Sequence, residues 1–288
     1  MIRIEIGRRN YLLYLLLPHL TKAALLTEDS RRRLDRINRD VNEAIYSGEG
    51  ATSYDRAHRY DEAEQHEYPA RVLVGEVWAP EGYGRALEVG AGTGYFTALI
   101  ARRARSVVAL EPVPDLQKVL RARCETEGLT NVEVIAAPAE AVSAHAAEAS
   151  MDSALLIQSL HHLHRRPELF EALGRAVRPG GRLFMIEPHH NLRRAARLLR
   201  HYLKIYRARA FWTDERNWAT HDFVTRREVR ALCRCGGFED VRISGHWIPY
   251  ARRMVSDPVA RFRLETVLGS VPGLRHFAAV LAVEARRR

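Results

Sequence analysis

Three glycines at alternate positions mark the stretch EVGAGTG, residues 88–94. They are Gly90, Gly92 and Gly94, and they lie between the apolar run RALEV and the helix-like run YFTALIARRA. A glycine turn after a strand lets the backbone approach a ligand more closely than a side chain would allow. Dinucleotide-binding turns space their glycines G-x-G-x-x-G, whereas here the spacing is G-x-G-x-G and the bulky Tyr95 follows. The loop therefore predicts a small ligand at a strand end, and its spacing argues against a pyrophosphate.

An acidic residue ends the second apolar run. Glu111 closes the stretch SVVALE, about 20 residues after the glycine loop. In open α/β sheets a carboxylate at this place accepts hydrogen bonds from ribose hydroxyls. The loop and Glu111 together predict a nucleoside-containing ligand; the alternative is a generic tight turn beside a surface carboxylate.

Two histidine clusters, HHLH and EPHH, follow the fourth and fifth apolar runs. Histidine titrates near neutral pH, so it is the natural general base in a reaction in which the substrate must lose a proton. Four residues are candidates for this base: His161, His162, His189 and His190. Glu187 orients a histidine or a substrate cation, or has a structural role, and His164, beside two arginines, is expected in solvent. The histidine spacing fits no zinc motif, so no metal site is expected.

Short apolar runs alternate with helix-like segments from residue 85 onward. The runs are RALEVG, SVVALEP, VEVIAAP, SALLIQSL and GRLFMIEP. Strands separated by helices of about ten to fifteen residues indicate crossover units and a parallel sheet with both faces covered. We expect a helix, a glycine stop and a sixth strand over residues 225–247. A helix near residues 258–268 and a last strand near residues 277–285 complete the predicted order.

These runs closely resemble the class I S-adenosylmethionine-dependent methyltransferases. The matching stretches are ALEVGAGTGYFT, VVALEP, NVEVIAAPAE, SALLIQSLHHL and RAVRPGGRLFMIEP, in this order over residues 85–188. The resemblance implies an α/β, Rossmann-like sheet of seven strands, mostly parallel, with an antiparallel last strand. It also implies S-adenosyl-L-methionine as the cofactor. Within that class, the motifs point only to the broad group that contains quinone-biosynthesis and other small-molecule methyltransferases.

The resemblance implies roles for the residues that match the family's motifs. The implied cofactor-binding set is Glu88, Gly90, Ala91, Gly92, Gly94, Glu111, Pro112, Ala139, Glu140 and Gln158. Glu88 and the first two loop glycines would frame the methionine end, Glu111 would bind the ribose, and Gln158 would face the cofactor. Residues 138–140 would lie beside the adenine. Many relatives have an aspartate where this chain has Pro138, which offers neither a carboxylate nor a backbone donor.

The resemblance also divides the chain. Residues 1–84 are expected to form a helical N-terminal extension or lid, and residues 85–288 the methyltransferase domain. A helical cap insertion is expected at about residues 189–224. The clearest helix of the extension, TEDSRRRLDRINRDVNEAIYSG, starts with capping residues and stops at a glycine. Tyr54 and Tyr60 either lie over the cofactor as part of a lid or pack elsewhere.

A basic amphipathic segment follows the fifth strand. NLRRAARLLRHYLKIYRARA, residues 191–210, has one apolar stripe, arginines on its other faces and no acid. Such a helix packs on the core with a solvated basic face, which we favour, or rests on an anionic membrane surface, or binds nucleic acid. Peripheral membrane contact would suit a lipid-like acceptor. Nucleic acid is not expected, because IQSLHHL stands where base-methylating enzymes carry an Asn/Asp-Pro-Pro-aromatic motif.

The composition is that of an ordinary globular protein with a strong positive charge. Of 288 residues, 47% are hydrophobic and 28% charged, and the net charge is +10. Arginine dominates the basic residues, which reflects a compositional bias or favours acidic partners. The longest apolar run, NYLLYLLLPHL, is too short to span a bilayer and is expected to be a buried or capping helix. The three cysteines form no disulfide framework, which predicts reduced thiols and a cytoplasmic location.

The sequence therefore predicts a methyltransferase that acts on a small or lipid-like organic acceptor. O-methylation with a histidine base is the first choice, and C-methylation is close behind. The alternatives are a non-catalytic partner or scaffold with this fold, a nicotinamide-dependent dehydrogenase and an RNA methyltransferase. The intact loop with Glu111 argues against a scaffold, and the glycine spacing argues against a dehydrogenase. An RNA enzyme would need the basic segment to form a positive groove continuous with the pocket.

Overall fold

The computed structural model of the chain describes residues 27–57, 68–196, 199–200, 222–248 and 251–288. The apolar run at residues 10–20, Tyr60 and most of the basic segment 191–210 lie outside this part of the chain. What the sequence predicts for them stays a prediction.

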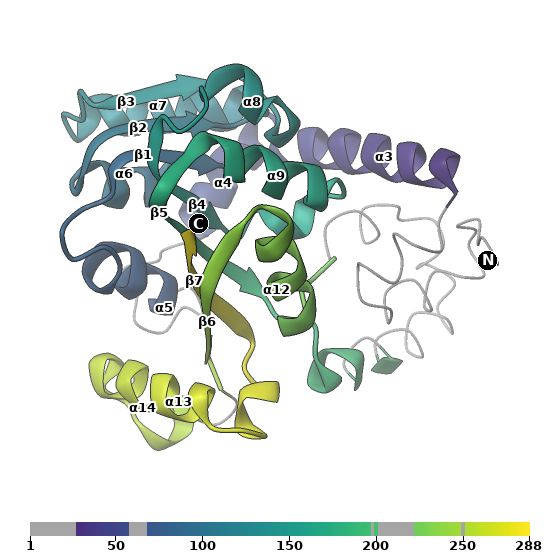
Figure 1. Cartoon of the computed structure of the whole chain (residues 1–288), viewed down its shortest axis with the longest axis vertical. Helices are drawn as coiled ribbons and strands as arrows, with labels where there is room; N and C mark the ends of the chain where they lie inside the picture. The colour runs from purple at the N-terminus through teal and green to yellow at the C-terminus, as the bar shows by residue number, and fades with distance from the viewer. Residues whose placement is uncertain (1–26, 58–67, 197–198, 201–221, 249–250) are drawn as a thin grey trace.

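A seven-stranded sheet is the centre of the molecule (Figure 1). Its strands are β1 (Gly84–Val89), β2 (Ala104–Leu110), β3 (Val132–Ile135), β4 (Met151–Ile157), β5 (Val177–Pro188), β6 (Phe238–His246) and β7 (Val280–Arg287). Their order is β3-β2-β1-β4-β5-β7-β6. Strands β1 to β5 pair in parallel, and β7 pairs antiparallel with both β5 and β6. The predicted sheet with its antiparallel last strand is confirmed.

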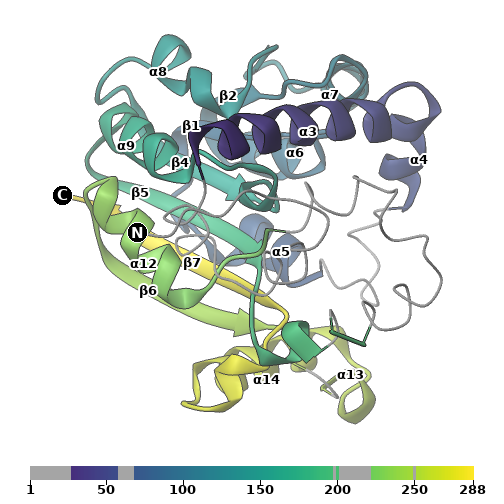
Figure 2. The same ribbon diagram turned by 90° about the vertical axis from the view of Figure 1, so that its right-hand side faces the viewer.

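Helices cover both faces of this sheet, as Figures 1 and 2 show. One face packs against α8 (Val142–His145), α9 (Arg166–Ala176) and α12 (Arg226–Cys235). The other packs against α5 (Tyr68–Val72), the π-helix η2 (Leu73–Val77), α6 (Tyr95–Ala101), α7 (Pro114–Thr126) and α14 (Pro258–Ser270). Side chains alternate along each strand, so Leu87 and Val89 enter the first core while Ala86 enters the second.

Two further helices precede the sheet. Helix α3 (Glu28–Tyr46) ends just before Gly48, whose φ is +55°, as its sequence predicted. Helix α4 (Glu49–Ala57) then packs on the start of α7, where the buried Ala51 contacts Val113 and Leu116. The described part of the chain thus begins with a helical pair docked beside the second strand.

Strand β5 is longer than the apolar run GRLFMIEP that predicted it. Strand β5 begins at Val177, which pairs with Met151, and the ladder shifts register before Ser153. Two short helices, η3 (Ala139–Ala141) and α8, precede β4. Helix α8 ends because Ala146 is already extended, and the Ala149 N–H bonds to the carbonyl of Arg175, 2.8 Å away, to lead into β4.

Every helix in the described ranges is too short or too polar to cross a membrane.

Candidate functional site

A cavity of about 450 Å³ lies at the carboxyl ends of β1, β2 and β4. This edge is where open α/β sheets bind ligands, because loops from several strands converge there. The cavity is lined by many residues that the sequence singled out: Gly90, Gly92, Glu111, Pro112, Ala139, Glu140, Gln158 and His162. Pro138 lines it as well. The structure therefore gathers the predicted loop, ribose, adenine and base positions around one space.

The three loop glycines have different surroundings. Their φ angles are +76° at Gly90, +58° at Gly92 and +80° at Gly94, all in the left-handed region that favours glycine. A Cβ atom on Gly90 would lie 2.6 Å from the Cβ of Ser159, and one on Gly94 would lie 2.7 Å from the Cγ of Leu120. A Cβ on Gly92 would meet no atom within 4 Å. Packing therefore requires glycine at the first and third positions, and the second opens onto the cavity.

Glu111 holds the loop by its side chain. Its carboxylate accepts hydrogen bonds from the N–H groups of Gly92, at 2.8 Å, and Val113, at 2.9 Å. Burial raises the pKa of this carboxyl group, and the two backbone bonds oppose the rise. An ionised carboxylate has about four acceptor positions. Two are used by these backbone donors, so Glu111 retains acceptor capacity where it borders the cavity.

Three members of the implied cofactor set do not line the cavity: Glu88, Ala91 and Gly94. Glu88 is buried, and its carboxylate accepts a 2.6 Å hydrogen bond from the hydroxyl of Thr97 on α6. Burial raises the pKa of Glu88 to about 8, although the Thr97 bond opposes the rise. Their contact with a cofactor stays a prediction, and their visible role is to hold the loop against α6 and α7.

Gln158 has an uncommon backbone conformation at the end of β4. Its φ is +55°, and its N–H donates to the carbonyl of Ile186 at 2.7 Å. A left-handed backbone at a residue other than glycine costs about 1–3 kcal/mol and persists where surrounding contacts impose it. The conformation turns Gln158 to the cavity that it lines, in agreement with its implied position beside the cofactor.

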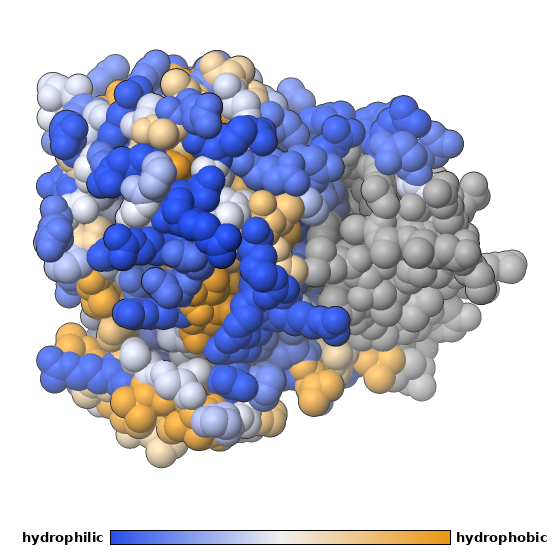
Figure 3. Space-filling view, in the orientation of Figure 1, coloured by the Kyte–Doolittle hydropathy of each residue, from blue (hydrophilic) through white to orange (hydrophobic). Residues whose placement is uncertain are grey.

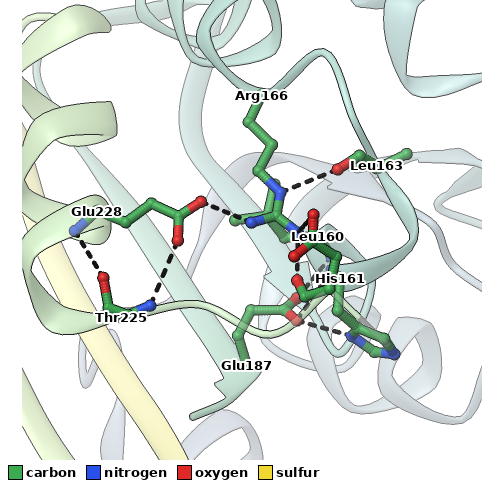
Figure 4. Close-up of polar contacts among 8 residues, drawn as sticks. Leu160, His161, Leu163, Arg166, Glu187, Thr225 and Glu228 are labelled. Atoms are coloured by element: carbon green, nitrogen blue, oxygen red, sulfur yellow. Dashed lines mark hydrogen bonds and ion pairs between the residues drawn. The ribbon is translucent and has the colours of Figure 1, made fainter. Parts of the chain in front are cut away.

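The turn after β4 carries two histidines in ring contact. His161 and His162 belong to η4 (Leu160–His162), and their ring centroids are 4.1 Å apart. His162 lines the cavity. His161 lies beside it, and its Nδ1 is 2.9 Å from a carboxylate oxygen of Glu187 (Figure 4). The structure thus places one candidate base in the cavity and the other between that base and a buried carboxylate.

Glu187 is fully buried at the end of β5. One carboxylate oxygen accepts the N–H groups of Ser159 and Leu160, each at 2.7 Å, and the other accepts the N–H of His161 at 3.3 Å. Burial raises the pKa of Glu187 to about 7, opposed by these backbone bonds and by the charge of Arg166. When Glu187 is ionised it only accepts, so His161 carries its proton on Nδ1 and leaves Nε2 as the acceptor. Glu187 thus contacts a histidine ring and supports the turn, while contact with a substrate cation stays a prediction.

A buried arginine, which the sequence did not single out, anchors the same turn (Figure 4). Arg166 is fully buried at the start of α9; its Nε donates to the carbonyl of Leu163 at 2.9 Å, and one terminal nitrogen lies 2.6 Å from Glu228. Its other terminal nitrogen donates to the carbonyl of Asp222. Glu228 also completes a capping box with Thr225 at the start of α12. In the sequence, an arginine within RRPE is expected to be a solvated charge at the start of a helix. No local pattern therefore predicts that Arg166 is a buried ion-pair partner.

The second pair of candidate bases lies elsewhere. His189 is buried, with Nδ1 3.1 Å from the carbonyl of Ala278, and burial lowers its pKa to about 4. The backbone N–H of His190 donates to the carbonyl of Val224. Neither residue lines the cavity. The structure therefore does not bring these two histidines together with His162.

Helices α3 and α4 form a wall of the cavity that sequence reasoning foresaw only at Tyr54. Five side chains line it from these helices: Arg39, Asn42, Glu43, Tyr46 and Tyr54. The rings of Tyr46 and Tyr54 meet edge to face, with centroids 5.0 Å apart. His164 also lines the cavity and is half-buried, so the expectation that it lies in solvent is wrong. The turn after β4 leads it under this wall instead.

Polar contacts dock α4 next to the glycine loop. The N–H of Gly48 donates to Asp115 at 2.7 Å, and Asp55 pairs with Arg123 at 2.7 Å. The Nε of Arg123 also donates to the carbonyl of Thr93, inside the loop, at 3.1 Å. One arginine thus contacts both the wall and the loop.

Across the described ranges, no three His, Cys, Asp or Glu side chains gather as ligands for a metal ion.

Comparison with known proteins agrees with this geometry. Residues 87–185 match a family model described as a methyltransferase domain. An uncharacterized methyltransferase of Mycobacterium tuberculosis is 33% identical over 107 residues, which are 37% of this chain and 41% of that protein. A ubiquinone biosynthesis O-methyltransferase of Xanthomonas oryzae is 31% identical over 103 residues, 35% of this chain and 41% of that protein. The matches thus span 41% of the length of each of these curated relatives.

A solved structure extends the likeness of the fold beyond the family match. Phosphoethanolamine N-methyltransferase 2 of Haemonchus contortus, in complex with S-adenosyl-L-methionine, superposes with a TM-score of 0.60 at 16% identity. The superposition covers 87% of this chain and 60% of that one. Together with the sheet order and the glycine loop, these matches identify residues 87–185 as a class I S-adenosylmethionine-dependent methyltransferase domain.

Proposed function

We propose that this chain transfers a methyl group from S-adenosyl-L-methionine to a small or lipid-like organic acceptor. The observation that carries the proposal is the cavity itself, which is lined by the glycine loop, Glu111 and His162. The names of two similar proteins, a ubiquinone biosynthesis O-methyltransferase and a phosphoethanolamine N-methyltransferase, support an acceptor of this class.

The residues present fit the cofactor. Gly92 offers backbone to the cavity with no atom within 4 Å of a Cβ position, so a ligand can approach it closely. Glu111 has acceptor capacity for ribose hydroxyls, and Ala139 with Glu140 gives the adenine an apolar contact and a flanking carboxylate. When bound, the cofactor supplies an electrophilic methyl group and is released as S-adenosylhomocysteine. The protein orients the two substrates and excludes water from between them.

His162 is the proposed general base. An acceptor hydroxyl gives its proton to the imidazole of His162 as its oxygen gains the methyl group, so charge and atoms balance. The ring of His161, oriented by Glu187, lies against His162 and fixes its position. C-methylation stays a close alternative, because the same base can take a proton from an activated carbon. His189 and His190 are weaker candidates, since neither lines the cavity.

The proposed organisation follows the predicted division. Residues 1–84 would serve as an N-terminal extension or lid, and α3 and α4 support this because they line the cavity. Residues 85–288 would form the methyltransferase domain, with the cap insertion at about 189–224. We also propose a cytoplasmic location, supported by the three free cysteines, and an acceptor other than nucleic acid.

Calorimetric titration with S-adenosyl-L-methionine, S-adenosylhomocysteine and NAD⁺ tests the cofactor. We expect the first two to bind and NAD⁺ not to bind; preference for NAD⁺ would refute the proposal. A panel of phenolic, quinol and amino-alcohol acceptors then tests turnover. We expect His162→Ala to lower kcat about 100-fold and to leave cofactor affinity unchanged. The base assignment is wrong if His162→Ala keeps full turnover of a hydroxyl acceptor.

A further inference from the structure

Exposed apolar side chains gather at one end of the molecule. In the part of the chain that the structure describes, all exposed large apolar residues except Val77 belong to two segments, residues 192–199 and 254–277. They are Leu192, Leu199, Met254, Val259, Val267, Val271, Leu274 and Phe277. Figure 3 shows the apolar colour along the lower end, where Figure 1 places α13 (Ala251–Met254) and α14. Monomeric proteins rarely leave such a group in water unless it meets a partner.

The two segments are neighbours in space. The guanidinium of Arg193 lies over the ring of Trp247 at 5.6 Å, and the Trp247 N–H donates to Glu265 of α14 at 2.7 Å. The side chain of Asn191 donates to the carbonyl of Ala278 at 2.7 Å. Figures 1 and 2 both show residues 192–196 beside the α13–α14 unit, at the lower end of the molecule. The exposed side chains therefore belong to one surface.

Helix α14 buries two charged residues and exposes two valines, although its Phe262 packs against the core. Arg261, Glu265 and Gly269 are spaced by four residues and are buried. Val259 and Val267, spaced by eight, are 51% and 63% exposed. A helix that needed only to cover β6 would bury its valines and expose its charges. The exposed valines would be buried if this face of the helix met an apolar environment outside the molecule.

The charge on this surface is positive. Its described arginines are the exposed Arg200 and Arg263, the half-buried Arg193, Arg194 and Arg275, and the buried Arg261; its acids are the exposed Asp257 and the buried Glu265. Exposed apolar side chains interspersed with arginines and almost free of exposed acid match an anionic bilayer. There the apolar groups enter the acyl boundary while the guanidinium groups meet lipid phosphates.

We propose that residues 192–196, 199–200 and 254–277 form a docking surface for an anionic lipid bilayer. The surface is separate from the cavity residues, so the proposal does not depend on methyl transfer. It assigns the membrane contact to the α13–α14 unit together with the described residues of the basic segment, so the protein would bind the membrane peripherally.

Vesicle co-sedimentation of the full chain tests the proposal. We expect binding to phosphatidylcholine vesicles that contain phosphatidylglycerol, and much weaker binding to phosphatidylcholine alone. Val267→Asp should weaken the binding about tenfold, because it removes an inserted side chain and adds a repelled charge. Arg263→Glu should weaken it by roughly the same factor, with the effect fading as salt is added.

Val77→Asp is the matched control, since Val77 is 48% exposed but lies outside this surface. Its vesicle binding should equal that of the wild type, and all variants should keep the wild-type circular dichroism spectrum. The proposal is overturned if the wild type does not sediment with anionic vesicles, or if Val77→Asp weakens binding as much as Val267→Asp. It is also overturned if light scattering shows a dimer that Val267→Asp dissociates while vesicle binding is unchanged. That result would make the surface an interface between two copies.

Discussion

Gly90 and Gly94 lie against Ser159 and Leu120, whereas Gly92 borders the cavity with open space beside it. At the scale of single residues, the three loop glycines all have left-handed φ angles, but two of them are required by packing and the third leaves space open. The carboxylate of Glu111 accepts a hydrogen bond from the N–H of Gly92, so the glycine with open space beside it is also held by this carboxylate.

Gly92→Ala tests whether this open position belongs to the cofactor. The left-handed backbone should lower the free energy of unfolding by about 1–2 kcal/mol. The added methyl group would also occupy cavity space, so affinity for S-adenosyl-L-methionine should fall. Gly128 is the control, because its φ of +64° and open surroundings match those of Gly92. Gly128→Ala should lose the same free energy of unfolding in urea and should keep the wild-type affinity for S-adenosyl-L-methionine in calorimetry. Equal cofactor affinities for the two variants would contradict the loop assignment.

Glu88→Gln tests the buried carboxyl beneath the loop. Burial raises the pKa of Glu88 from 4.5 to about 8 in the folded state, which therefore binds this proton more tightly than the unfolded state does. The contribution of Glu88 to the free energy of unfolding should thus fall as pH rises from about 4.5 to about 8 and stay constant above. The glutamine keeps an acceptor for Thr97 and does not titrate. Across this pH range, the free energy of unfolding of the variant should rise relative to that of the wild type by on the order of 5 kcal/mol in urea unfolding; a constant difference would refute the burial effect.

At the scale of elements, α4 is attached to the parts that shape the cofactor site. Ala51 packs on α7, Gly48 bonds to Asp115, and Asp55 reaches Arg123, which also holds the carbonyl of Thr93. Tyr54, next to Asp55, lines the cavity. The position of the wall and the shape of the loop are therefore coupled through one guanidinium group.

Asp55→Asn should weaken cofactor binding about fivefold, because the loss of a partly buried ion pair frees α4 from the loop. Arg123→Gln should have an equal or larger effect, and the double variant should be no worse than Arg123→Gln alone. Arg71→Gln is the control, since Arg71 pairs with Glu76 at 3.2 Å, shares no ion pair with Arg123 and lines no part of the cavity. Calorimetry on the four variants measures the coupling, and strictly additive losses would show that the two residues act separately.

At the scale of the whole molecule, Arg166 ties distant parts of the chain together. It bonds to the histidine turn through Leu163, to the residues that lead into α12 through Asp222, and to α12 itself through Glu228. Its charge also acts on Glu187 at the end of β5. The turn that carries His161 and His162 and the residues that lead into α12 thus share one buried cation.

Arg166→Gln should lower the free energy of unfolding by about 3–5 kcal/mol, because it leaves Glu228 buried without its cation. Arg178→Gln gives the comparison, since Arg178 pairs with Asp152 at the same kind of distance, 2.7 Å, but is 52% exposed. That variant should lose less than about 1 kcal/mol. Urea denaturation measures both, and similar losses would mean that the burial of Arg166 contributes nothing to stability.

The sequence by itself determined the features that depend on short stretches of chain. The apolar runs predicted the strands, the capping start and Gly48 predicted the limits of α3, and the spacing EVGAGTG predicted the loop. The position of Glu111 at a strand end also sufficed to place it beside that loop, because parallel strands deliver their carboxyl ends to one edge. Each of these rests on backbone preference or side-chain period, which neighbouring residues set.

The tertiary structure alone decided which side chains share a space. His162 and His189 both follow strand ends, yet only His162 lines the cavity, while His189 is buried against the carbonyl of Ala278. Arg166 reads as a solvated charge in its sequence but is buried between segments more than fifty residues apart. The wall formed by α3 and α4 likewise depends on where a helix docks. Burial and ion pairing are properties of contacts between distant segments, so no local pattern in the chain encodes them.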